Sequence, residues 1–469
     1  MSLGLSLPSA KVSAFLVLVF LGFGVLIGRT TRQPQDARAA SVGRIVTVAS
    51  PTTAPSASSA PTSSSSTAGG EPPEVEAEPT PAPAAGATKR SAAKTRTPSH
   101  EKRSRKPGAS HGAGGSGEAA AGAPAIKLPA IKHVFVIVLS NQPYAAVFGP
   151  ESSARYLAHT LERQGELLTR YDAVAHEELA NGVALLSGQG PTADTAANCA
   201  TYAAISPATI GASEQALGNG CVYPPSTQTL PGQLTAKRLT WRAYVQGIDE
   251  GGATAGACAH PALGQPDPTS ATSGGTGAYA TFRNPLVYFQ SLVDTPSCAA
   301  NDVGLDRLKP DLRSASRTPS FSLIIPDRCH DGNPTPCTAG APAGLGPADA
   351  FLQRIVPEIT ASKAYKRDGL LAITVDQAPS SGEFADSSSC CGQPRFPNLT
   401  VGLSPRGGGT VGALLLSPYV KAGATSQEPF NHFSLLRTIE DLFGLGHLGY
   451  AALPAVKPFS PGMFTAAKN

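Results

Sequence analysis

The sequence predicts an α/β fold with a mostly parallel central sheet and helices on both of its faces. The first observation is the apolar run 133–139, HVFVIVL, which is typical of a strand buried on both faces. The second is that strand and helix signals alternate through the rest of the chain after about residue 126. The third is that polar residues follow several of these strands, at the edge where open α/β sheets bind ligands.

The elements follow one another in a regular order along the chain. After the first strand we expect a helix at 152–164, with Leu157 and Leu161 on one side, and then a strand and a helix. The further strands and helices are identified by runs of apolar residues or by apolar spacings of three and four. The predicted strands are 167–175, 239–248, 321–326, 370–376 and 411–420; the predicted helices are 180–186, 348–366 and 432–443. The Gly- and Pro-rich stretches 251–279 and 331–347 are predicted surface loops over the site.

The first forty residues contain a membrane-directed segment. Residues 12–28 form an uncharged, mostly apolar run of 17 residues, preceded by Lys11 and followed by Arg29 and Arg32. This length is at the short end for a membrane span and long for the core of a signal peptide. We predict an uncleaved signal anchor over residues 1–40, with a cleaved signal peptide as the alternative. The protein is then a single-pass protein of the cell membrane with an extracytoplasmic domain, or secreted if the segment is cleaved.

Residues 41–125 are predicted to be a disordered linker. They are rich in Ala, Pro, Ser, Thr and Gly, and too few large apolar side chains are present to stabilise a core. The stretch 89–106 holds eight Lys and Arg residues, a tract that could touch anionic lipids but is more often a solvated linker. Residues 126–469 hold 24 Lys+Arg and 26 Asp+Glu, a net charge of 24 − 26 = −2. The folded part is therefore not expected to bind nucleic acid.

All eight cysteines lie after residue 190, and none forms a CxxC pair. An even number of cysteines in this pattern indicates disulfides and an oxidising, extracytoplasmic compartment. Nearby cysteines give three plausible local bridges, Cys199–Cys221, Cys258–Cys298 and Cys329–Cys337. The adjacent pair 390–391 is left without an assignment.

Polar side chains that could carry chemistry follow four of the predicted strands or open the last helix. They are Ser140 and Asn141, then His176, Glu177 and Glu178, then the segment 327–331, then Asp376, and finally Asn431 and His432. Carboxylate, amide and imidazole groups at one edge of a sheet suit a divalent metal or a phosphoryl group. Each residue also has a purely structural alternative, such as a turn at Ser140 or a helix N-cap at Asn431.

Several sequence blocks carry a family resemblance. The most specific is VGALLLSPYVKAGATSQEPFNHFSLLRTIEDLFGLGHL at 411–448, and others are TWRAYVQGI, CAHPALG, RNPLVYF, GPADAFLQRIVPEI and GLLAITVDQ. Residues 131–450 resemble the bacterial phosphoesterase family of phospholipases C and acid phosphatases, especially a secreted actinobacterial branch. The resemblance implies an alkaline-phosphatase-like fold for residues 126–469. It also implies metal-assisted hydrolysis of a phosphoester by a Ser or Thr at a helix N-terminus.

The chain departs from the family pattern at the nucleophile and at the first metal ligand. The family's first strand usually ends in Glu-Asn, and here it ends in Ser140-Asn141. The nucleophile segment usually resembles His-Pro-Ser-Leu-x-Asn, and residues 176–181 are HEELAN, so Glu178 stands in place of the nucleophilic Ser. By resemblance, His176 and Asn181 keep substrate-binding positions.

Further departures replace ligands by neutral or cationic groups. The segment 331–334 is DGNP where the family has Asp-Gly-His-Asp, and Gln377 follows Asp376 where the family has Glu. Arg283 and Gln290 stand at the positions of family histidines. A divalent ion needs several deprotonated ligands, and the metal ligands left by resemblance are Asp376, His432 and Asn141.

Two hypotheses follow. In the first, the protein is still a phosphoesterase of low activity, with one divalent metal held by Asp376 and His432. In a more specific version of it, Ser140 and Glu178 have exchanged the roles of nucleophile and ligand. In the second, it is an inactive, membrane-tethered binding protein on the same fold. Arg283 would then suit a phosphoester or another anionic ligand without any metal.

Overall fold

The computed structural model describes residues 128–250, 256–270, 277–399 and 407–465. The chain divides into two units, Met1–Gly112 and Ala113–Asn469, and every described residue belongs to the second. The predicted anchor at 1–40 and linker at 41–125 lie outside the described residues. Among the helices that are described, none is both long and apolar enough to cross a membrane.

The centre of the second unit is a sheet of eight strands in the order β11-β2-β10-β9-β1-β8-β6-β7. Neighbours from β9 to β7 pair in parallel, whereas β10 runs antiparallel to both β9 and β2. The strand bounds are β1 His133–Leu139, β2 Glu166–Leu168, β6 Trp241–Val245, β7 Asp302–Gly304, β8 Phe321–Ile325, β9 Gly369–Val375, β10 Ala413–Leu416 and β11 Ala424–Ser426. The prediction of a mostly parallel central sheet is confirmed.

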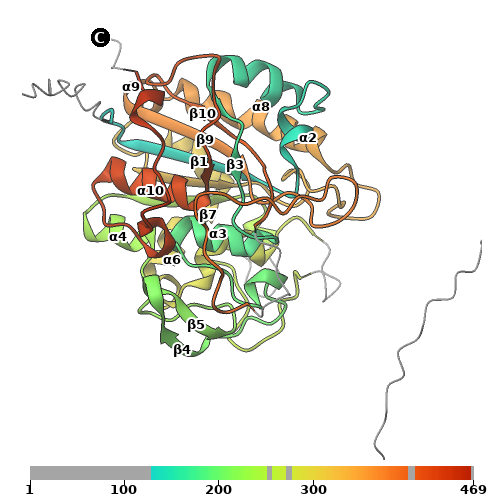
Figure 1. Ribbon diagram of the computed structural model, residues 1–469, viewed down its shortest axis with the longest axis vertical. Coiled ribbons are helices and arrows are strands. Elements are labelled where there is room, and N and C mark those ends of the chain that lie inside the picture. Colours follow the sequence, from blue (N-terminus) through green and yellow to red (C-terminus); the bar gives the residue numbers. More distant parts are fainter. Residues whose placement is uncertain (1–127, 251–255, 271–276, 400–406, 466–469) are drawn as a thin grey trace, which may run out of the picture. The chain divides into compact units, whose positions relative to one another are not determined.

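Helices cover both faces of this sheet. The helices α2 (Tyr144–Phe148) and α8 (Leu345–Ala361) lie on one side of it, and α3 (Glu178–Ser187), α4 (Leu230–Ala236) and α10 (His432–Phe443) lie on the other (Figure 1). Both faces of the central strands are therefore buried, which explains the uninterrupted apolar sequences of β1 and β9. Shorter helices are α5 Gln290–Val293, α6 Pro296–Asn301, α7 Leu308–Asp311 and α9 Lys363–Asp368, with 3₁₀ turns η8 Thr281–Arg283 and η9 Pro285–Tyr288.

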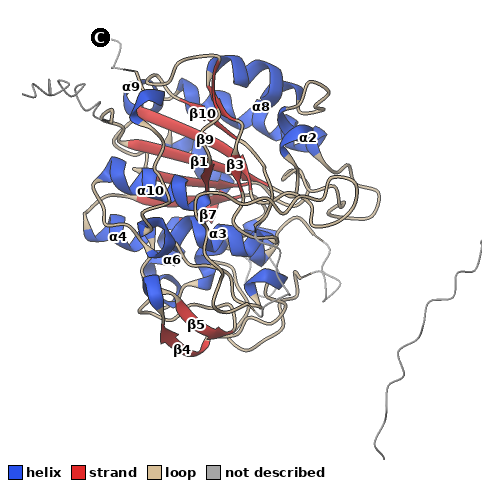
Figure 2. Ribbon diagram, viewed as in Figure 1, coloured by secondary structure: helices blue, strands red, loops and turns tan. Residues whose placement is uncertain are grey.

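Two small sheets stand beside the central one. Strands β4 (Ser206–Ile210) and β5 (Ala216–Asn219) form an antiparallel hairpin apart from the main sheet (Figure 2). Strands β3 (Tyr171–Asp172) and β12 (Phe430–Asn431) pair in parallel, with Asn431 opposite Asp172. Because α10 begins directly after β12, this pairing brings the start of α10 next to Tyr171.

Two predicted strands are shorter or more divided than expected. The predicted strand 167–175 is two strands, β2 and β3, in different sheets, because a turn at Thr169 and Arg170 redirects the chain. Of the predicted strand 411–420, only the four residues of β10 form a strand, and this strand runs antiparallel to β9. Gly412 has a positive φ of 74° at its start, and Pro418, which has no N–H to donate, follows its end.

The predicted helices are also modified at their ends. The segment 152–164 forms a π-helical turn, η1 Tyr156–Leu161, followed by the 3₁₀ turn η2 Glu162–Gln164. The predicted helix 348–366 is two helices, because Ser362 leaves the helical conformation and caps α9 by accepting from the Tyr365 N–H. Helix α3 begins at Glu178, two residues before the predicted start, so this carboxylate lies in the first turn.

The disulfides match the local pairing predicted from the sequence. Bridges join Cys199 to Cys221, Cys258 to Cys298, and Cys329 to Cys337, and the adjacent Cys390 and Cys391 are joined to each other. The predicted loop at 331–347 is irregular as far as Gly344, where α8 follows. Part of the predicted loop at 251–279 lies outside the described residues.

Candidate functional site

Arg283 is the centre of a buried cluster of charges beyond the carboxyl ends of β1 and β9. It ends η8, and its side chain is only 5% exposed. Its Nη1 donates to Oδ2 of Asp376 at 2.8 Å, and its Nη2 donates to the Val138 carbonyl at 3.2 Å. Its Nε lies 3.4 Å from Oδ2 of Asp331, an ion pair without hydrogen-bond geometry. One guanidinium therefore faces two carboxylates and a main-chain carbonyl.

The charges of this cluster shift one another's pKa. Burial lowers the pKa of Arg283, but Asp331, Asp376 and Glu178 raise it more, so the guanidinium stays charged. Burial raises the pKa of Asp331 to about 6, against the opposing effect of Arg283. Burial also raises the pKa of Asp376 well above its ordinary value, and the guanidinium and the Asn141 N–H oppose this rise. Burying the guanidinium or either carboxyl group alone would cost free energy, and the attraction between these opposite charges offsets that cost.

Asp376 follows β9 directly, as the sequence predicts for a site residue. Both of its carboxylate oxygens are occupied, because Oδ1 accepts from the main-chain N–H of Asn141 at 3.0 Å and Oδ2 accepts from Arg283. Asn141 has a positive φ of 50°, a conformation that Asn tolerates better than most residues. Asn141 thus contributes its main chain, and not its side-chain amide, to the contact with Asp376.

His432 opens α10 and is 1% exposed. Its Nε2 lies 3.0 Å from the Asp376 main-chain carbonyl, and its Nδ1 lies 2.9 Å from the Tyr171 hydroxyl. Because a carbonyl only accepts, Nε2 carries the proton, and the lone pair of Nδ1 accepts from Tyr171. Burial lowers the pKa of His432 to about 4, so the ring is neutral at physiological pH.

Ser140 and Glu178 face each other across the site. Both are buried, and the Ser140 hydroxyl donates to Oε1 of Glu178 at 3.1 Å. Oε1 also accepts from Nδ2 of Asn333 at 3.3 Å, and Oε2 accepts from Nδ2 of Asn198 at 2.5 Å. Three neutral donors thus satisfy the carboxylate of Glu178.

Asn181 and His176 have other partners. The Asn181 side chain accepts from the N–H groups of Val174 and Ala175, and it donates to the carbonyls of Ala175 and Glu177. All of its hydrogen-bonding capacity therefore holds the turn before α3. His176 lies outside the Arg283 cluster, with its Nε2 3.0 Å from the Ser387 hydroxyl.

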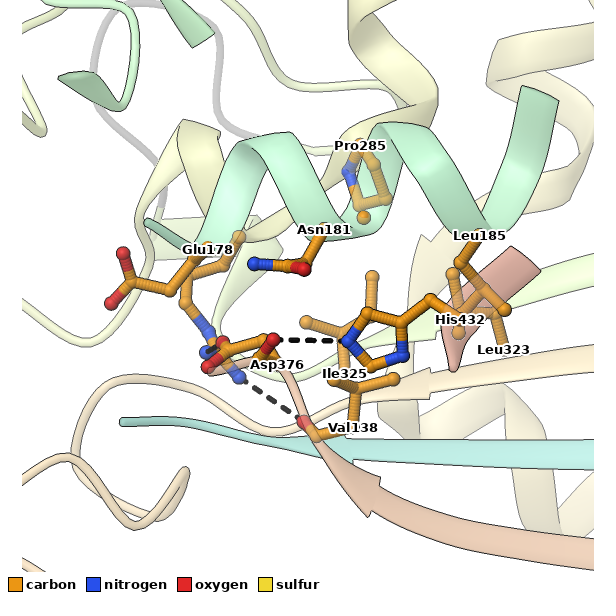
Figure 3. Close-up of a pocket in the computed structure, with 11 residues that line it drawn as sticks. Val138, Glu178, Asn181, Leu185, Pro285, Leu323, Ile325, Asp376 and His432 are labelled. Carbon is orange, nitrogen blue, oxygen red and sulfur yellow. Dashed lines mark hydrogen bonds and ion pairs between the residues drawn. The ribbon is translucent and has the colours of Figure 1, made fainter. Parts of the chain in front are cut away.

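A small cavity lies between Glu178 and His432. Figure 3 shows Glu178 at one end and His432 at the other, with Asn181 above and Asp376 between them. The cavity has a volume of about 30 Å³, room for roughly two water molecules. Its remaining walls are mainly apolar, from Leu185, Leu323, Ile325 and their neighbours, and Ser140 is not part of its lining.

Comparison with known proteins identifies the family. A model described as the phosphoesterase family matches residues 157–446, more than half of the chain. The chain belongs to the phosphoesterase family. The resemblance predicted from the sequence blocks is thereby confirmed.

Relatives of this phosphoesterase-family chain are distant. The phosphatidylinositol-3-phosphatase of Mycobacterium tuberculosis (strain ATCC 25618 / H37Rv) is 24% identical over 335 residues, which cover 70% of this chain and 83% of that protein. A protein of the alkaline phosphatase superfamily from Vibrio parahaemolyticus is 11% identical, covers 71% of each chain and has a TM-score of 0.40. The phosphonate monoester hydrolase of Silicibacter pomeroyi is 10% identical, covers 71% of this chain and 76% of its own, and has a TM-score of 0.40.

A divalent metal of the kind implied by this family does not fit the side chains present. His432 has no free lone pair, both carboxylate oxygens of Asp376 are occupied, and Glu178 is satisfied by three donors. The Arg283 guanidinium already supplies a positive charge among the carboxylates, where a second cation would be repelled.

Another group with metal-ligating residue types, Cys258, Cys298 and Asp302, lies elsewhere in the described part of the chain. The two sulfurs of this group are bonded to each other, so they offer no thiolate to a metal.

Several residues of the cluster were not singled out from the sequence. Asp331 was noted only within a polar segment and as the first residue of DGNP, and Asn333 only as a replacement for a family histidine. The partners Tyr171 and Asn198 gave no signal of their own. Asp331 could have been found from its position after β8, since β8 pairs with β1 and their carboxyl ends meet at one edge. Tyr171 and Asn198 reach the site through β3 and a loop, which only the tertiary structure brings there.

Proposed function

We propose that this phosphoesterase-family protein has lost metal-dependent hydrolysis and works as a binding protein on the hydrolase fold. The observation that carries the proposal is the position of Arg283, bonded to Asp376 and paired with Asp331 where the family chemistry needs a metal cation. A guanidinium neutralises the carboxylates, but it provides no open coordination position for a substrate oxygen or a water molecule.

The nucleophile position supports the same conclusion. Glu178 stands in the first turn of α3 where the family has a serine, and its carboxylate is held by Ser140, Asn198 and Asn333. A carboxyl group in this position offers no serine hydroxyl to attack the phosphorus of a phosphoester.

We also propose that the protein works outside the cytoplasm, held at the membrane by its N-terminal segment. The support is the apolar run at 12–28 and the four disulfides of the folded unit, which persist in oxidising compartments. The first ligand class to test is a phosphoester-bearing lipid, because the relative from Mycobacterium tuberculosis is a phosphatidylinositol-3-phosphatase.

The test combines metal content, turnover and binding on the full chain purified in mild detergent. Elemental analysis is expected to show far less than one divalent metal per chain. Aryl phosphate mono- and diesters, with added Mn²⁺, Zn²⁺, Ca²⁺ or Mg²⁺, are expected to remain intact. Near-stoichiometric metal together with turnover that is abolished by Asp376→Ala would overturn the proposal.

The binding arm uses vesicles of phosphatidylcholine with or without phosphatidylinositol 3-phosphate. Cosedimentation with the phosphoinositide vesicles and no release of phosphate is the expected result. Release of phosphate would overturn the loss of hydrolysis. Equal binding to both kinds of vesicle would overturn the phosphoester as ligand, while the loss of hydrolysis would stand.

One observation favours a second candidate, a metal-independent hydrolase. The Ser140 hydroxyl donates to Glu178 at 3.1 Å, the geometry of a nucleophile beside a general base. This pair requires that the buried Ser140 become accessible to substrate. If slow turnover is found without metal, Ser140→Ala must abolish it, and turnover that persists in Ser140→Ala excludes this candidate.

A further inference from the structure

A buried carboxyl group lies beside the Cys258–Cys298 disulfide, away from the Arg283 cluster. A carboxyl oxygen of Asp302, at the start of β7, lies within 4.8 Å of both sulfur atoms. Within the described part of the chain, none of the other disulfides has a carboxyl group placed in this way. The arrangement is independent of the proposed loss of hydrolysis.

Asp302 is positioned by two hydrogen bonds and has one unused oxygen. Its Oδ2 accepts from Nδ2 of Asn284 at 2.7 Å, and its main-chain carbonyl accepts from the Cys258 N–H at 3.0 Å. Its Oδ1 has no hydrogen-bond partner among the described residues, and the side chain is fully buried. A buried carboxyl oxygen without a donor favours the protonated form of the group.

The charges around Asp302 leave it able to hold a proton near neutral pH. Burial raises its pKa to about 7, and the Asn284 bond opposes this rise. The other titratable groups facing this region are Tyr279, whose hydroxyl lies 3.5 Å from Nδ2 of Asn284, and Asp267 beyond it. Within the described residues, no Lys or Arg forms an ion pair with Asp302 that would keep it ionised.

The two sulfurs differ in their access to solvent. Cys258 is half-buried, whereas Cys298 is 1% exposed. Of the two cysteines, Cys258 is therefore the more accessible to a thiolate that attacks from outside. The sulfur of Cys298 becomes the leaving group, and a thiolate in a buried, mainly apolar position is unfavourable unless it gains a proton.

We propose that the Cys258–Cys298 disulfide is a thiol–disulfide exchange site for an extracytoplasmic dithiol, with Asp302 as the proton donor to Cys298. A thiolate of the dithiol attacks Sγ of Cys258 and forms a mixed disulfide. The Cys258–Cys298 bond breaks, its electron pair goes to Sγ of Cys298, and that sulfur takes the proton of the Asp302 carboxyl group. The second thiol of the dithiol then displaces Cys258 as a thiolate, which leaves the dithiol oxidised and the protein's disulfide reduced.

The chain contains a matched internal control for this proposal. The Cys329–Cys337 disulfide also joins a half-buried cysteine to a buried one, since Cys337 is 2% exposed. Among the described residues, no carboxyl group lies within 4.8 Å of both of its sulfurs, although Oδ1 of Asp327 accepts from the Cys329 N–H at 3.0 Å. Because both disulfides meet the same thiolate concentration, the ratio of their reduction rates removes the pH dependence of the reductant.

The experiment treats the full chain with excess dithiothreitol between pH 6 and pH 9. Samples are quenched by alkylation, and peptide mass spectrometry gives the reduction rate of each disulfide. In the wild type, the rate of Cys258–Cys298 relative to Cys329–Cys337 is expected to fall by about tenfold or more as the pH rises through 7. In Asp302→Asn the ratio is expected to be independent of pH and about tenfold below the wild-type value at pH 6.

A second variant keeps the test decisive if Asp302→Asn does not fold. Asn284→Leu removes the hydrogen bond that opposes protonation of Asp302, so the fall in the ratio is expected at a higher pH. A ratio that is constant with pH in the wild type overturns the proposal. Equal ratios in the wild type and in a folded Asp302→Asn overturn it as well.

Discussion

The Tyr171 hydroxyl lies 2.9 Å from Nδ1 of His432 and donates to its lone pair. The opposite nitrogen, Nε2, donates to the main-chain carbonyl of Asp376 at 3.0 Å. The ring is therefore held as a neutral bridge between β3 and the end of β9. The contact exists because β3 pairs with β12, which leads directly into α10.

This neutral histidine predicts a loss of stability in acid. Burial lowers the folded-state pKa of His432 from 6.5 to about 4, so the unfolded chain takes up the proton first. The contribution is fully present above pH 6.5 and is lost as the pH falls through 4, with a total of about 3 kcal/mol. We expect His432→Gln, which retains a donor and an acceptor but does not titrate, to lack this part of the pH dependence. Urea unfolding of both proteins between pH 4 and 7 measures the difference, and parallel curves would contradict the expectation.

Removal of Arg283 is predicted to be among the most destabilising single changes in the domain. Arg283→Met leaves Asp376 and Asp331 buried without their cation, which costs about 3–5 kcal/mol. The control is Arg367→Met, whose own side chain is 60% exposed and whose buried partner Asp368 keeps a second partner in His133, with an expected cost of about 0–1 kcal/mol. Chemical denaturation of the two variants compares these costs. A similar loss in the free energy of unfolding for both variants would show that the buried ion pairs of Arg283 contribute no more than an exposed one.

A smaller side chain at position 283 is predicted to create a site for a divalent ion. Arg283→Ala frees the carboxylates of Asp376 and Asp331, with Glu178 nearby, and removes the cation that repels a metal. We expect millimolar Mn²⁺ to raise the melting temperature of Arg283→Ala and to leave that of the wild type unchanged. The double variant Arg283→Ala/Asp376→Asn should lose the response. An equal rise in the melting temperature of the wild type with Mn²⁺ would contradict the assignment of Arg283 as the internal cation.

Asn181 is predicted to act on stability. Its side chain makes four hydrogen bonds to the main chain of residues 174–177, in the turn that leads into α3. Asn181→Ala leaves buried main-chain groups without partners, at a cost of about 2–3 kcal/mol. The variant should therefore unfold at lower urea concentration. Unchanged stability with altered ligand binding would instead support the substrate-binding role that the family resemblance implies.

Glu440 in α10 predicts a stabilising substitution. The residue is fully buried, its Oε1 accepts from the Leu448 N–H at 2.9 Å, and its Oε2 has no hydrogen-bond partner among the described residues. Burial raises its pKa to about 8, so its stabilising contribution is lost as the pH rises from 4.5 through 8. Glu440→Gln is expected to exceed the wild type in stability by about 2–4 kcal/mol at pH 8 and by less at pH 5. An equal gain at both pH values would show that ionisation is not the cause.

The central sheet could be predicted from the sequence because strands that are buried on both faces have uninterrupted apolar sequences. The apolar runs of β1 and β9 indicate parallel strands between two layers of helices, and the polar residues after them indicate the edge where the site lies. The short strands β11 and β12 could not be predicted, because two or three residues are too few to show a period, and β2 and β3 were predicted only as one continuous strand at 167–175. Their pairing depends on turns and on neighbours far along the chain.

The candidate site could be predicted only in part. The residue types at 140, 178 and 283 indicated a changed chemistry, and the structure brings these positions and the retained Asp376 to the same end of the sheet. The sequence did not indicate that Arg283 pairs with Asp376 and Asp331, because that contact joins η8 to two separate loops. The sequence also did not indicate that all hydrogen bonds of the Asn181 side chain go to the main chain of the turn before α3. In the family pattern the same residue implies contact with substrate.

The bridging of two loops by Arg283 has a consequence for how this protein can evolve. Asp331 and Asp376 lie after β8 and β9, on either side of β1, and one side chain holds both. A lineage that loses the arginine alone inherits two unbalanced buried acids, and one that loses both acids inherits an unbalanced buried cation. The three residues are therefore expected to change together, because replacing them one at a time passes through an unstable intermediate. In descendants of this sequence, Arg283, Asp331 and Asp376 should be retained together or replaced together.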